Sequence, residues 1–431
     1  MNRIKAIAEM KAAFEQENSQ NEIIPGKDFI PHAAKVVDSN EISYLSESVL
    51  DAWFTTGRFA ENFELALKKF YSLRSASLVN SGSSANLVAL SALTSPTLQN
   101  RAIKKDDEVI TVAAGFPTTV NPIIQVGARP VFLDIELPSY NMDVKQLEEA
   151  LSSKTKAVML AHTLGNPFEL DVIQDFCTKH NLWLIEDNCD AFGSKFNGQL
   201  TGTFGDISTL SFYPAHHITT GEGGAVLTNS AKLRVLIESF RDWGRDCYCL
   251  PGQDNTCLKR FDQKHGDLPF GYDHKFVYSH IGFNLKMTDM QAAIGVAQME
   301  KVLSFIEKRK ENWAYLRNAF SDLEEYFILP EKATNSEPSW FGFALTIRES
   351  SKFNRQDILS HLAENKIGTR LLFAGDLTKQ PSFKAANFKK IGNLNNTSTV
   401  TENTFWLGCW PGLKNQHLDY MYESVLNFIK K

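Results

Sequence analysis

Short hydrophobic runs alternate with helical patterns through the first half of the chain. The runs that predict strands lie at 77–80, 107–112, 128–135, 157–162, 181–187, 206–212 and 223–229. Helical patterns separate several of them, for example at 143–152 and 168–180. This alternation predicts an α/β fold in which helices cover both faces of a mostly parallel sheet. Ligands of such sheets bind at the carboxyl ends of the strands, so residues that follow the strands are the first candidates for a site.

The pattern changes after residue 245. The segment 245–280 has few periodic apolar positions and many turn formers, and loops of this length are usually functional or disordered. A long amphipathic helical pattern resumes over 287–325, followed by a strand at 340–347 and a final helix near 415–430. We therefore predict a large domain over residues 1–290, with an N-terminal helical segment and the irregular 245–280 insertion. A smaller α+β domain is predicted over residues 291–431.

Composition narrows the class of protein. Of the 431 residues, 43% are hydrophobic and 22% are charged, which is the balance of a soluble globular protein. The net charge of -5 argues against a nucleic-acid partner, which favours a basic face. No apolar run is long enough to cross a bilayer, and the charged N-terminal helical pattern lacks the apolar core and cleavage site of a secretory signal. We expect a cytoplasmic protein.

Two short motifs follow predicted strands and carry candidate ligands. In the Ser81-Gly82-Ser83-Ser84-Ala85 turn, backbone N–H groups and hydroxyls suit a phosphate, although a serine N-cap alone has the same pattern. Asp187 and Asp190 lie at the end of another strand. A buried carboxylate needs a positive partner, such as a protonated pyridine nitrogen, although a strand-end acid can equally cap a helix.

A third motif, SFYPAHHITTGEGGAV at 211–226, makes the pattern specific. With it, the chain resembles the sugar aminotransferase (DegT/DnrJ/EryC1-like) family of fold-type-I pyridoxal phosphate enzymes. The resemblance spans most of the chain and also rests on Gly82-Ser83-Ser84, Phe116, Asp187, the stretch 282–295 and Pro411-Gly412-Leu413. It implies a mostly parallel seven-stranded sheet flanked by helices.

His216 stands where members of this family have the lysine that binds the cofactor covalently. Imidazole cannot form that bond, but it can act as a base near neutral pH. The substitution predicts a cofactor that is held noncovalently, best as pyridoxamine 5'-phosphate (PMP), the amine form of pyridoxal phosphate (PLP). The alternative is an inactive family member, which a functional replacement such as histidine disfavours.

The resemblance also implies roles for individual residues. His216 is expected to remove a proton from the cofactor, with Asp190 and Tyr213 as further catalytic residues. Asp187 should hold the pyridine nitrogen, and Phe116 should stack on the ring. Asn284 matches a residue that relatives donate from a neighbouring subunit, which implies a homodimer with composite active sites. The full set of expected cofactor-binding residues is Gly82, Ser83, Ser84, Phe116, Asp187, Ser211 and Asn284.

Four of the six cysteines are candidate metal ligands, namely Cys189, Cys247, Cys249 and Cys257. Four thiolates suit an iron–sulfur cluster or a structural zinc, and the spacing alone leaves both open. The chain is similar to a subgroup of the family, the CDP-4-keto-6-deoxyglucose 3-dehydrases, which carry both the histidine and this cysteine pattern. Cys177 and Cys409 lack such a context and are expected to be structural.

That subgroup implies a PMP- and [2Fe–2S]-dependent removal of the C3 hydroxyl from CDP-4-keto-6-deoxyglucose. Its products are 3,6-dideoxyhexoses of lipopolysaccharide O-antigens. A separate NAD(P)H-dependent flavin and iron–sulfur reductase would supply the electrons.

Two other functions stay open. One is a cluster-free, PMP-dependent 3-dehydratase of a GDP- or TDP-linked 4-keto-6-deoxy sugar, whose known members lack the four cysteines. The other is a non-catalytic regulator with the PLP fold, which need not bind PMP. An ordinary aminotransferase is disfavoured by His216.

Overall fold

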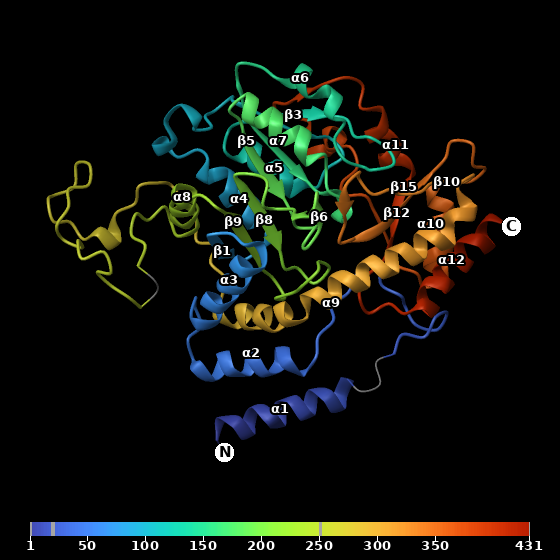
Figure 1. Cartoon of the computed structure of the whole chain (residues 1–431), viewed down its shortest axis with the longest axis horizontal. Coiled ribbons are helices and arrows are strands. Elements are labelled where there is room, and N and C mark those ends of the chain that lie inside the picture. Colours follow the sequence, from blue (N-terminus) through green and yellow to red (C-terminus); the bar gives the residue numbers. More distant parts are fainter. Residues whose placement is uncertain (1, 19–21, 250–251, 431) are drawn as a thin grey trace.

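The computed structural model describes residues 2–18, 22–249 and 252–430 and is built around an eight-stranded sheet (Figure 1). Strand β9 is antiparallel to both of its neighbours, and the strands from β8 to β14 run parallel. The predicted fold class is confirmed, and all seven predicted strands are present. In spatial order the strands are β1 (Ser75–Val79), β9 (Gly224–Thr228), β8 (Ile207–Ser211), β5 (Trp183–Asp187), β4 (Thr155–Ala161), β2 (Glu108–Val112), β3 (Arg129–Leu133) and the additional short edge strand β14 (Lys389–Lys390).

Both faces of this sheet are buried, which explains its continuous hydrophobic runs. Successive side chains of a strand point to opposite faces, as Val109 and Ile110 of β2 illustrate. Val109 packs in one core cluster and Ile110 in another. The first cluster includes helices α4 (Gly82–Ala92), α5 (Pro117–Gln125) and α8 (Ala231–Arg241), and the second includes α6 (Leu147–Ala150) and α7 (Leu170–Lys179).

The helix predicted at 143–152 is shorter than expected. Asp143 caps a 3-10 turn at Val144–Gln146, α6 then makes a single turn, and the chain extends at Leu151 toward β4. The helix predicted at 168–180 is α7.

A second, four-stranded antiparallel sheet has the order β10-β12-β15-β13. Helix α9 extends beneath both sheets and ends beside α12 (Figure 1). The elements of this half are α9 (Asp289–Ala319), β10 (Phe327–Ile328), β12 (Gly342–Ile347), α10 (Arg355–Glu364), β13 (Thr369–Leu371), α11 (Asn395–Asn403), β15 (Thr404–Gly408) and α12 (Asn415–Ile429). A third, small sheet joins β11 (Ser336–Glu337), β6 (Lys195–Phe196) and β7 (Gln199–Leu200).

The domain boundary near residue 290 stays a prediction, because the two halves exchange segments. Ile30, far upstream of α9, packs in the core of the second sheet and pairs with Ile367. Conversely, β14 from the C-terminal half extends the large sheet beside β3.

The start of α9 is capped, and it is joined to the start of α3 (Arg58–Tyr71). Thr288 and Gln291 form a capping box, and the buried carboxylate of Asp289 accepts hydrogen bonds from the N–H groups of Gly57 (3.0 Å) and Ala60 (2.8 Å). These bonds tie α9 to α3, so that both helices support the large sheet.

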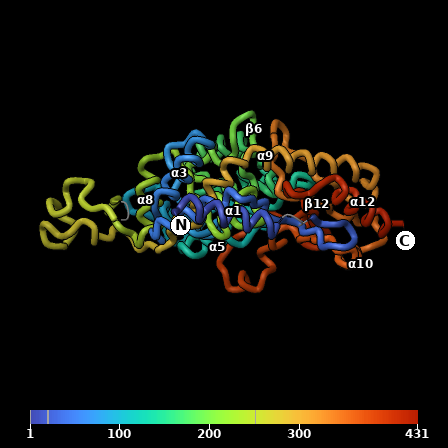
Figure 2. Tube along the Cα trace, turned by 90° about the horizontal axis from the view of Figure 1, so that it is seen from below, coloured from blue at the N-terminus to red at the C-terminus, as the bar shows by residue number. Residues whose placement is uncertain are grey.

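Two segments lie outside this body. Helix α1 (Arg3–Asn18) confirms the helix predicted at the N-terminus and packs outside α2 (Ser39–Asp51). None of its residues is buried, so it has no buried apolar face. The described part of the 245–280 segment is irregular except for a 3-10 turn at His274–Phe276, and it projects from the body in both views (Figures 1 and 2). Within the described residues, no helix is long and apolar enough to cross a membrane.

The core beneath the strand ends depends on Phe63 of α3. Its ring is 0% exposed, lies 4.9 Å from the ring of Phe212, and fills the space beside Gly295 of α9. Phe63→Ala should lower the free energy of unfolding by about 3–5 kcal/mol, because the cavity adds to the lost burial. Urea unfolding followed by tryptophan fluorescence measures the change. Phe54→Ala, at a side chain that is 60% exposed, should stay within about 0.5 kcal/mol, and an equal loss in both variants would contradict the assignment.

Candidate functional site

A cavity of about 520 Å³ lies between the two sheets, at the carboxyl ends of β5 and β8. The large sheet and its helices contribute most of its wall, and the second sheet contributes Arg370, Leu371 and Trp406. The cavity brings together nine of the residues predicted from sequence. These are Gly82, Ser83, Phe116, Asp187, Cys189, Asp190, Ser211, Tyr213 and His216.

The N-terminus of α4 forms one end of the cavity. The Ser81 side chain caps the helix by accepting the N–H of Ser84 at 3.0 Å, so the serine-cap interpretation holds. A Cβ on Gly82 would lie 2.5 Å from Cβ of Ser211, so only glycine allows the helix to approach β8 this closely. Gly82, Ser83 and Ser211 then face the cavity together. Ser84, with its N–H used by the cap, does not line it.

The carboxylate of Asp187 is held from several directions at the end of β5. Its Oδ2 accepts hydrogen bonds from Asn86 (2.8 Å) and Thr119 (2.7 Å), and its Oδ1 accepts the N–H of Cys189 (3.2 Å). The residue is 4% exposed, and its position is fixed before any ligand binds. Thr209 donates to Oδ1 of Asn86 (2.6 Å) and so orients the amide.

Asn86 and Thr119 were not predicted as site residues. Both stand in helices whose other positions on the same face are apolar and buried. A polar residue on a buried helix face was the only signal that sequence offered, and it does not reveal which carboxylate the residue serves.

The structure distinguishes His216 from its neighbour His217. The ring of His216 lines the cavity, places Nε2 3.3 Å from Oδ1 of Asp190, and stacks on Phe341 with ring centroids 5.2 Å apart. His217 turns into the protein and donates from Nε2 to the carbonyl of Ser339 at 2.7 Å. Burial lowers the pKa of His217 well below its ordinary value, with the charge of Arg309 as the next cause. His217 is therefore a neutral structural group, and His216 is the candidate base.

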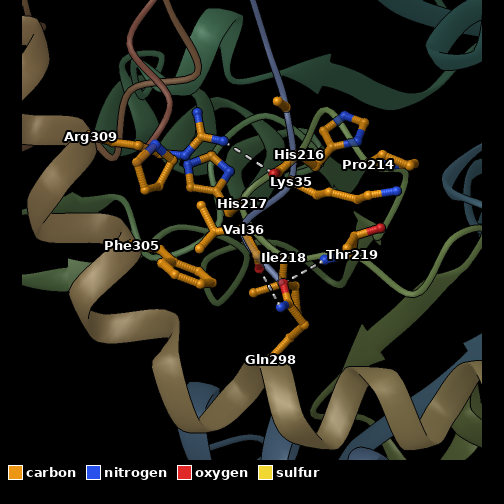
Figure 3. Close-up of a pocket in the computed structure, with 12 residues that line it drawn as sticks. Lys35, Val36, Pro214, His216, His217, Ile218, Thr219, Gln298, Phe305 and Arg309 are labelled. Atoms are coloured by element: carbon orange, nitrogen blue, oxygen red, sulfur yellow. Dashed lines mark hydrogen bonds between the residues drawn. The ribbon is translucent and has the colours of Figure 1, made fainter. Parts of the chain in front are cut away.

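The loop that carries these histidines is held from behind by α9 (Figure 3). Arg309 donates from Nη2 to the carbonyl of His216 (3.1 Å). Gln298 accepts the N–H of Thr219 (3.2 Å) and donates to the carbonyl of Val36 (2.9 Å). The space enclosed by these residues holds only about 10 Å³, so it is a packing gap behind the loop and not a ligand site.

Asp190, Tyr213 and Phe116 complete the predicted set. Burial raises the pKa of the Asp190 carboxyl, and its pairing with His216 opposes that shift. Tyr213 is 51% exposed, with its ring 6.4 Å from that of His216. Phe116 begins α5 and meets Phe373 edge-on at 6.2 Å, so its ring also forms part of the wall.

The four predicted metal ligands are not gathered in one chain. Cys189 lines the cavity, and burial, with Asp187 next, raises the pKa of its thiol well above the ordinary value. The other three lie in the projecting segment, where Cys249 donates its N–H to Sγ of Cys247 (3.5 Å) and Cys257 lies 3.8 Å from Nδ1 of His274. Over residues 2–18, 22–249 and 252–430, no group of three or more His, Cys, Asp or Glu side chains is placed to hold a metal ion.

Asn284 also lies outside the cavity of its own chain. It pairs with Asp242 in an isolated β-bridge, and its Oδ1 accepts from Lys286 at 3.2 Å. A role toward a neighbouring subunit remains a prediction.

Comparisons with known proteins agree on one family. The model of the DegT/DnrJ/EryC1/StrS aminotransferase family matches residues 35–426. The chain is 53% identical over 423 residues to the lipopolysaccharide biosynthesis protein RfbH of Salmonella typhimurium, covering 98% of this chain and 97% of the relative. It is 49% identical over 418 residues to dTDP-4-dehydro-2,6-dideoxy-D-glucose 3-dehydratase of Saccharopolyspora spinosa, covering 97% and 90%.

A solved structure extends the likeness to three dimensions. E. coli GDP-4-keto-6-deoxy-D-mannose-3-dehydratase with bound hydrated PLP matches with a TM-score of 0.82 and 29% identity, covering 92% of this chain and 99% of that chain. Two of these three relatives are named as 3-dehydratases of nucleotide-linked sugars, and one was solved with PLP.

The raised pKa of Asp190 predicts how stability depends on pH. The folded protein binds this proton more tightly than the unfolded chain, so stability falls as pH rises from the ordinary value of 3.8 through the folded pKa. Asp190→Asn removes this penalty and should raise the thermal midpoint at neutral pH, with a gain that shrinks on acidification through that window. Thermal scans at several pH values test this, and Asp267→Asn, at an exposed acid, is the control. A lower midpoint for Asp190→Asn at neutral pH would show that pairing with His216 outweighs burial.

Proposed function

Because this chain belongs to the DegT/DnrJ/EryC1/StrS aminotransferase family, we propose that it removes the C3 hydroxyl of a nucleotide-linked 4-keto-6-deoxy sugar, with PMP as its cofactor. The observation that carries the proposal is His216, which faces the cavity where an aminotransferase needs lysine. No lysine is among the described residues that line this cavity. Without a lysine amine the cofactor is not tethered, and dehydration becomes the reaction that a histidine base can serve.

The cavity residues fit the cofactor. The N-terminus of α4, with Ser83 and Ser211, would hold its phosphate, because helix N-termini bind anions. Asp187, held by Asn86 and Thr119, would pair with the protonated pyridine nitrogen. When bound, the cofactor supplies an amine that condenses with the substrate's 4-keto group and a ring that accepts electrons.

His216 acts in this proposal as the base at the C4′ carbon of the cofactor. Its contact with Asp190 (Nε2 to Oδ1, 3.3 Å) and its stacking on Phe341 fix the ring. Nδ1 of His216 and Oδ2 of Asp190 are buried and have no hydrogen-bond partner among the described residues. Buried polar atoms are usually paired, so such atoms beside a cavity suit groups that exchange a proton with a bound molecule. Tyr213, half exposed beside His216, would position the sugar.

The replacement of His216 tests this role. His216→Asn keeps a polar side chain of similar reach but no base, so we expect dehydration to fall by roughly 10²–10⁴-fold. Binding of PMP, followed by its absorbance, should be nearly unchanged. The reaction is measured by mass spectrometry of the released sugars. In CDP-, dTDP- and GDP-linked 4-keto-6-deoxy sugars the C3 hydroxyl would be replaced by hydrogen, a net loss of one oxygen, and the two electrons would come from conversion of PMP to PLP and ammonia.

The control is His180→Asn, because His180 lies outside the cavity at the end of α7. Unchanged dehydration by His216→Asn would remove His216 from the role of base. A wild-type protein that binds no PMP and dehydrates none of the sugars would favour the regulator and overturn the proposed function.

A finer proposal concerns the nucleotide that the substrate carries and the source of the electrons. We propose, on the cysteine spacing and the resemblance it carries, a CDP-linked substrate, a [2Fe–2S] cluster and a separate flavin and iron–sulfur reductase. Cys247 and Cys249 lie in contact in the projecting segment, but Cys189 is in the cavity, so one chain does not surround a cluster. No chemical step is therefore assigned to the cluster. The names of the dTDP- and GDP-specific relatives favour the cluster-free dehydratase.

Metal analysis of protein purified without oxygen decides between the cluster-dependent reaction and the cluster-free reaction. The finer proposal expects about two irons and two acid-labile sulfides per chain, the content of a [2Fe–2S] centre. Cys249→Ser should abolish that content while Cys177→Ser, at a buried cysteine of α7, should preserve it. Zinc or no metal, in protein that still dehydrates its substrate, would leave the cluster-free reaction in place.

The finer proposal also includes a homodimer. Asn284 is exposed and lies outside the cavity of its own chain, and it would serve the site of a second copy. Light scattering of the purified protein measures the oligomeric state.

A further inference from the structure

The charges of the cavity are uneven. Its described lining includes three acids, Asp187, Asp190 and Glu222, and only one residue with a permanent positive charge, Arg370. The proposed substrate carries a diphosphate, which needs positive partners where it leaves water. Among these lining residues, Arg370 is therefore the one permanent positive charge that could meet a diphosphate.

Arg370 belongs to the second sheet, whereas the expected cradle for the cofactor phosphate belongs to α4 and β8. It lies on β13 directly opposite Trp406 of β15. The indole of Trp406 donates to the carbonyl of Leu371 at 3.1 Å, which fixes the backbone beside Arg370. The position of the side chain at the cavity wall is thus set by the sheet.

The guanidinium itself is not neutralised. Arg370 is exposed, and its hydrogen bond in the structure goes from Nη1 to the carbonyl of Thr369 at 2.9 Å. Across the described part of the chain, no carboxylate lies within ion-pairing distance of it. The neighbouring His32 adds no second positive charge at neutral pH, because burial and then the charge of Arg370 lower its pKa to about 4. An arginine held without an acid at the wall of a ligand cavity is suited to a phosphate, which its planar fork can bind through two hydrogen bonds.

We propose that Arg370 binds the diphosphate of the nucleotide-linked substrate and so sets where the sugar lies relative to His216. This inference rests on the proposed function and adds a residue that contacts the substrate. Aromatic side chains lie between Arg370 and His216. Phe341 stacks on His216, and its ring centroid lies 5.4 Å from that of Trp406. Trp406 is the cross-strand partner of Arg370. A substrate anchored at Arg370 would extend along this apolar wall toward the base.

Binding of CDP, dTDP and GDP to the PMP-loaded protein, measured by isothermal titration calorimetry, tests the proposal without turnover. Arg370→Gln should weaken binding of the nucleotides by about tenfold or more, because hydrogen bonds to charged groups are the strong ones. With substrate, KM should rise by a similar factor, and kcat should also fall because the sugar is held less firmly beside His216. Arg370→Lys should retain part of the affinity, and affinity in the wild type should fall with added salt.

Arg74→Gln is the matched control, since Arg74 is exposed and does not line the cavity. Equal nucleotide binding by Arg370→Gln and the wild type would overturn the inference and leave the proposed dehydration standing. A loss of PMP binding in Arg370→Gln would also overturn it, by assigning Arg370 to the cofactor phosphate. If the wild type binds none of the three nucleotides, the inference is overturned, and the assay with the sugar substrates decides separately whether the proposed function stands.

Discussion

The buried guanidinium of Arg309 holds the site together. It is fully buried, and its hydrogen bonds go to main-chain carbonyls. Nη2 donates to His216, and Nη1 donates to Trp340 and Phe341 at 3.3 Å each. A buried cation is tolerated only when hydrogen bonds replace its lost hydration. Helix α9, the loop after β8 and the chain leading into β12 must therefore keep their relative positions. The stacking of His216 on Phe341, and with it one wall of the cavity, follows from that constraint.

Histidine in place of lysine changes how the cofactor has to be retained. Without a covalent bond, affinity depends on contacts that are already in place before the cofactor arrives. Asp187 is oriented by Asn86, Thr119 and the chain at Cys189, and Gly82 lets α4 approach β8 closely enough to present its N-terminus. These groups belong to rigid elements of the large sheet. In the proposed function, the groups that would hold an untethered cofactor would also position it for His216.

The cavity and the projecting segment are separate parts of one chain. The proposed dehydration uses only residues of the cavity, which are contributed by both sheets and by the helix ends between them. Cys247, Cys249 and Cys257 lie in the described part of the 245–280 segment, which extends away from the body (Figure 1). In the proposed function, electron transfer would be an addition to the removal of the C3 hydroxyl.

The local pattern of hydrophobic and polar residues determined most strands of the large sheet and the expected place of the site. The seven long strands follow from hydrophobic runs, because a strand buried on both faces leaves a continuous apolar signature. The expected positions of Asp187, Ser211 and His216 at one sheet edge follow from topology, since the ends of parallel strands meet there. Tertiary structure alone decided what holds the neighbouring His217, that Asn86 and Arg370 border the cavity, and that Cys189 stands apart from the other predicted metal ligands. The physical reason is that such contacts join residues far apart in the chain, and their geometry depends on how the sheets and α9 pack. The Asn86–Asp187 and His217–Ser339 pairs, for example, are 101 and 122 positions apart.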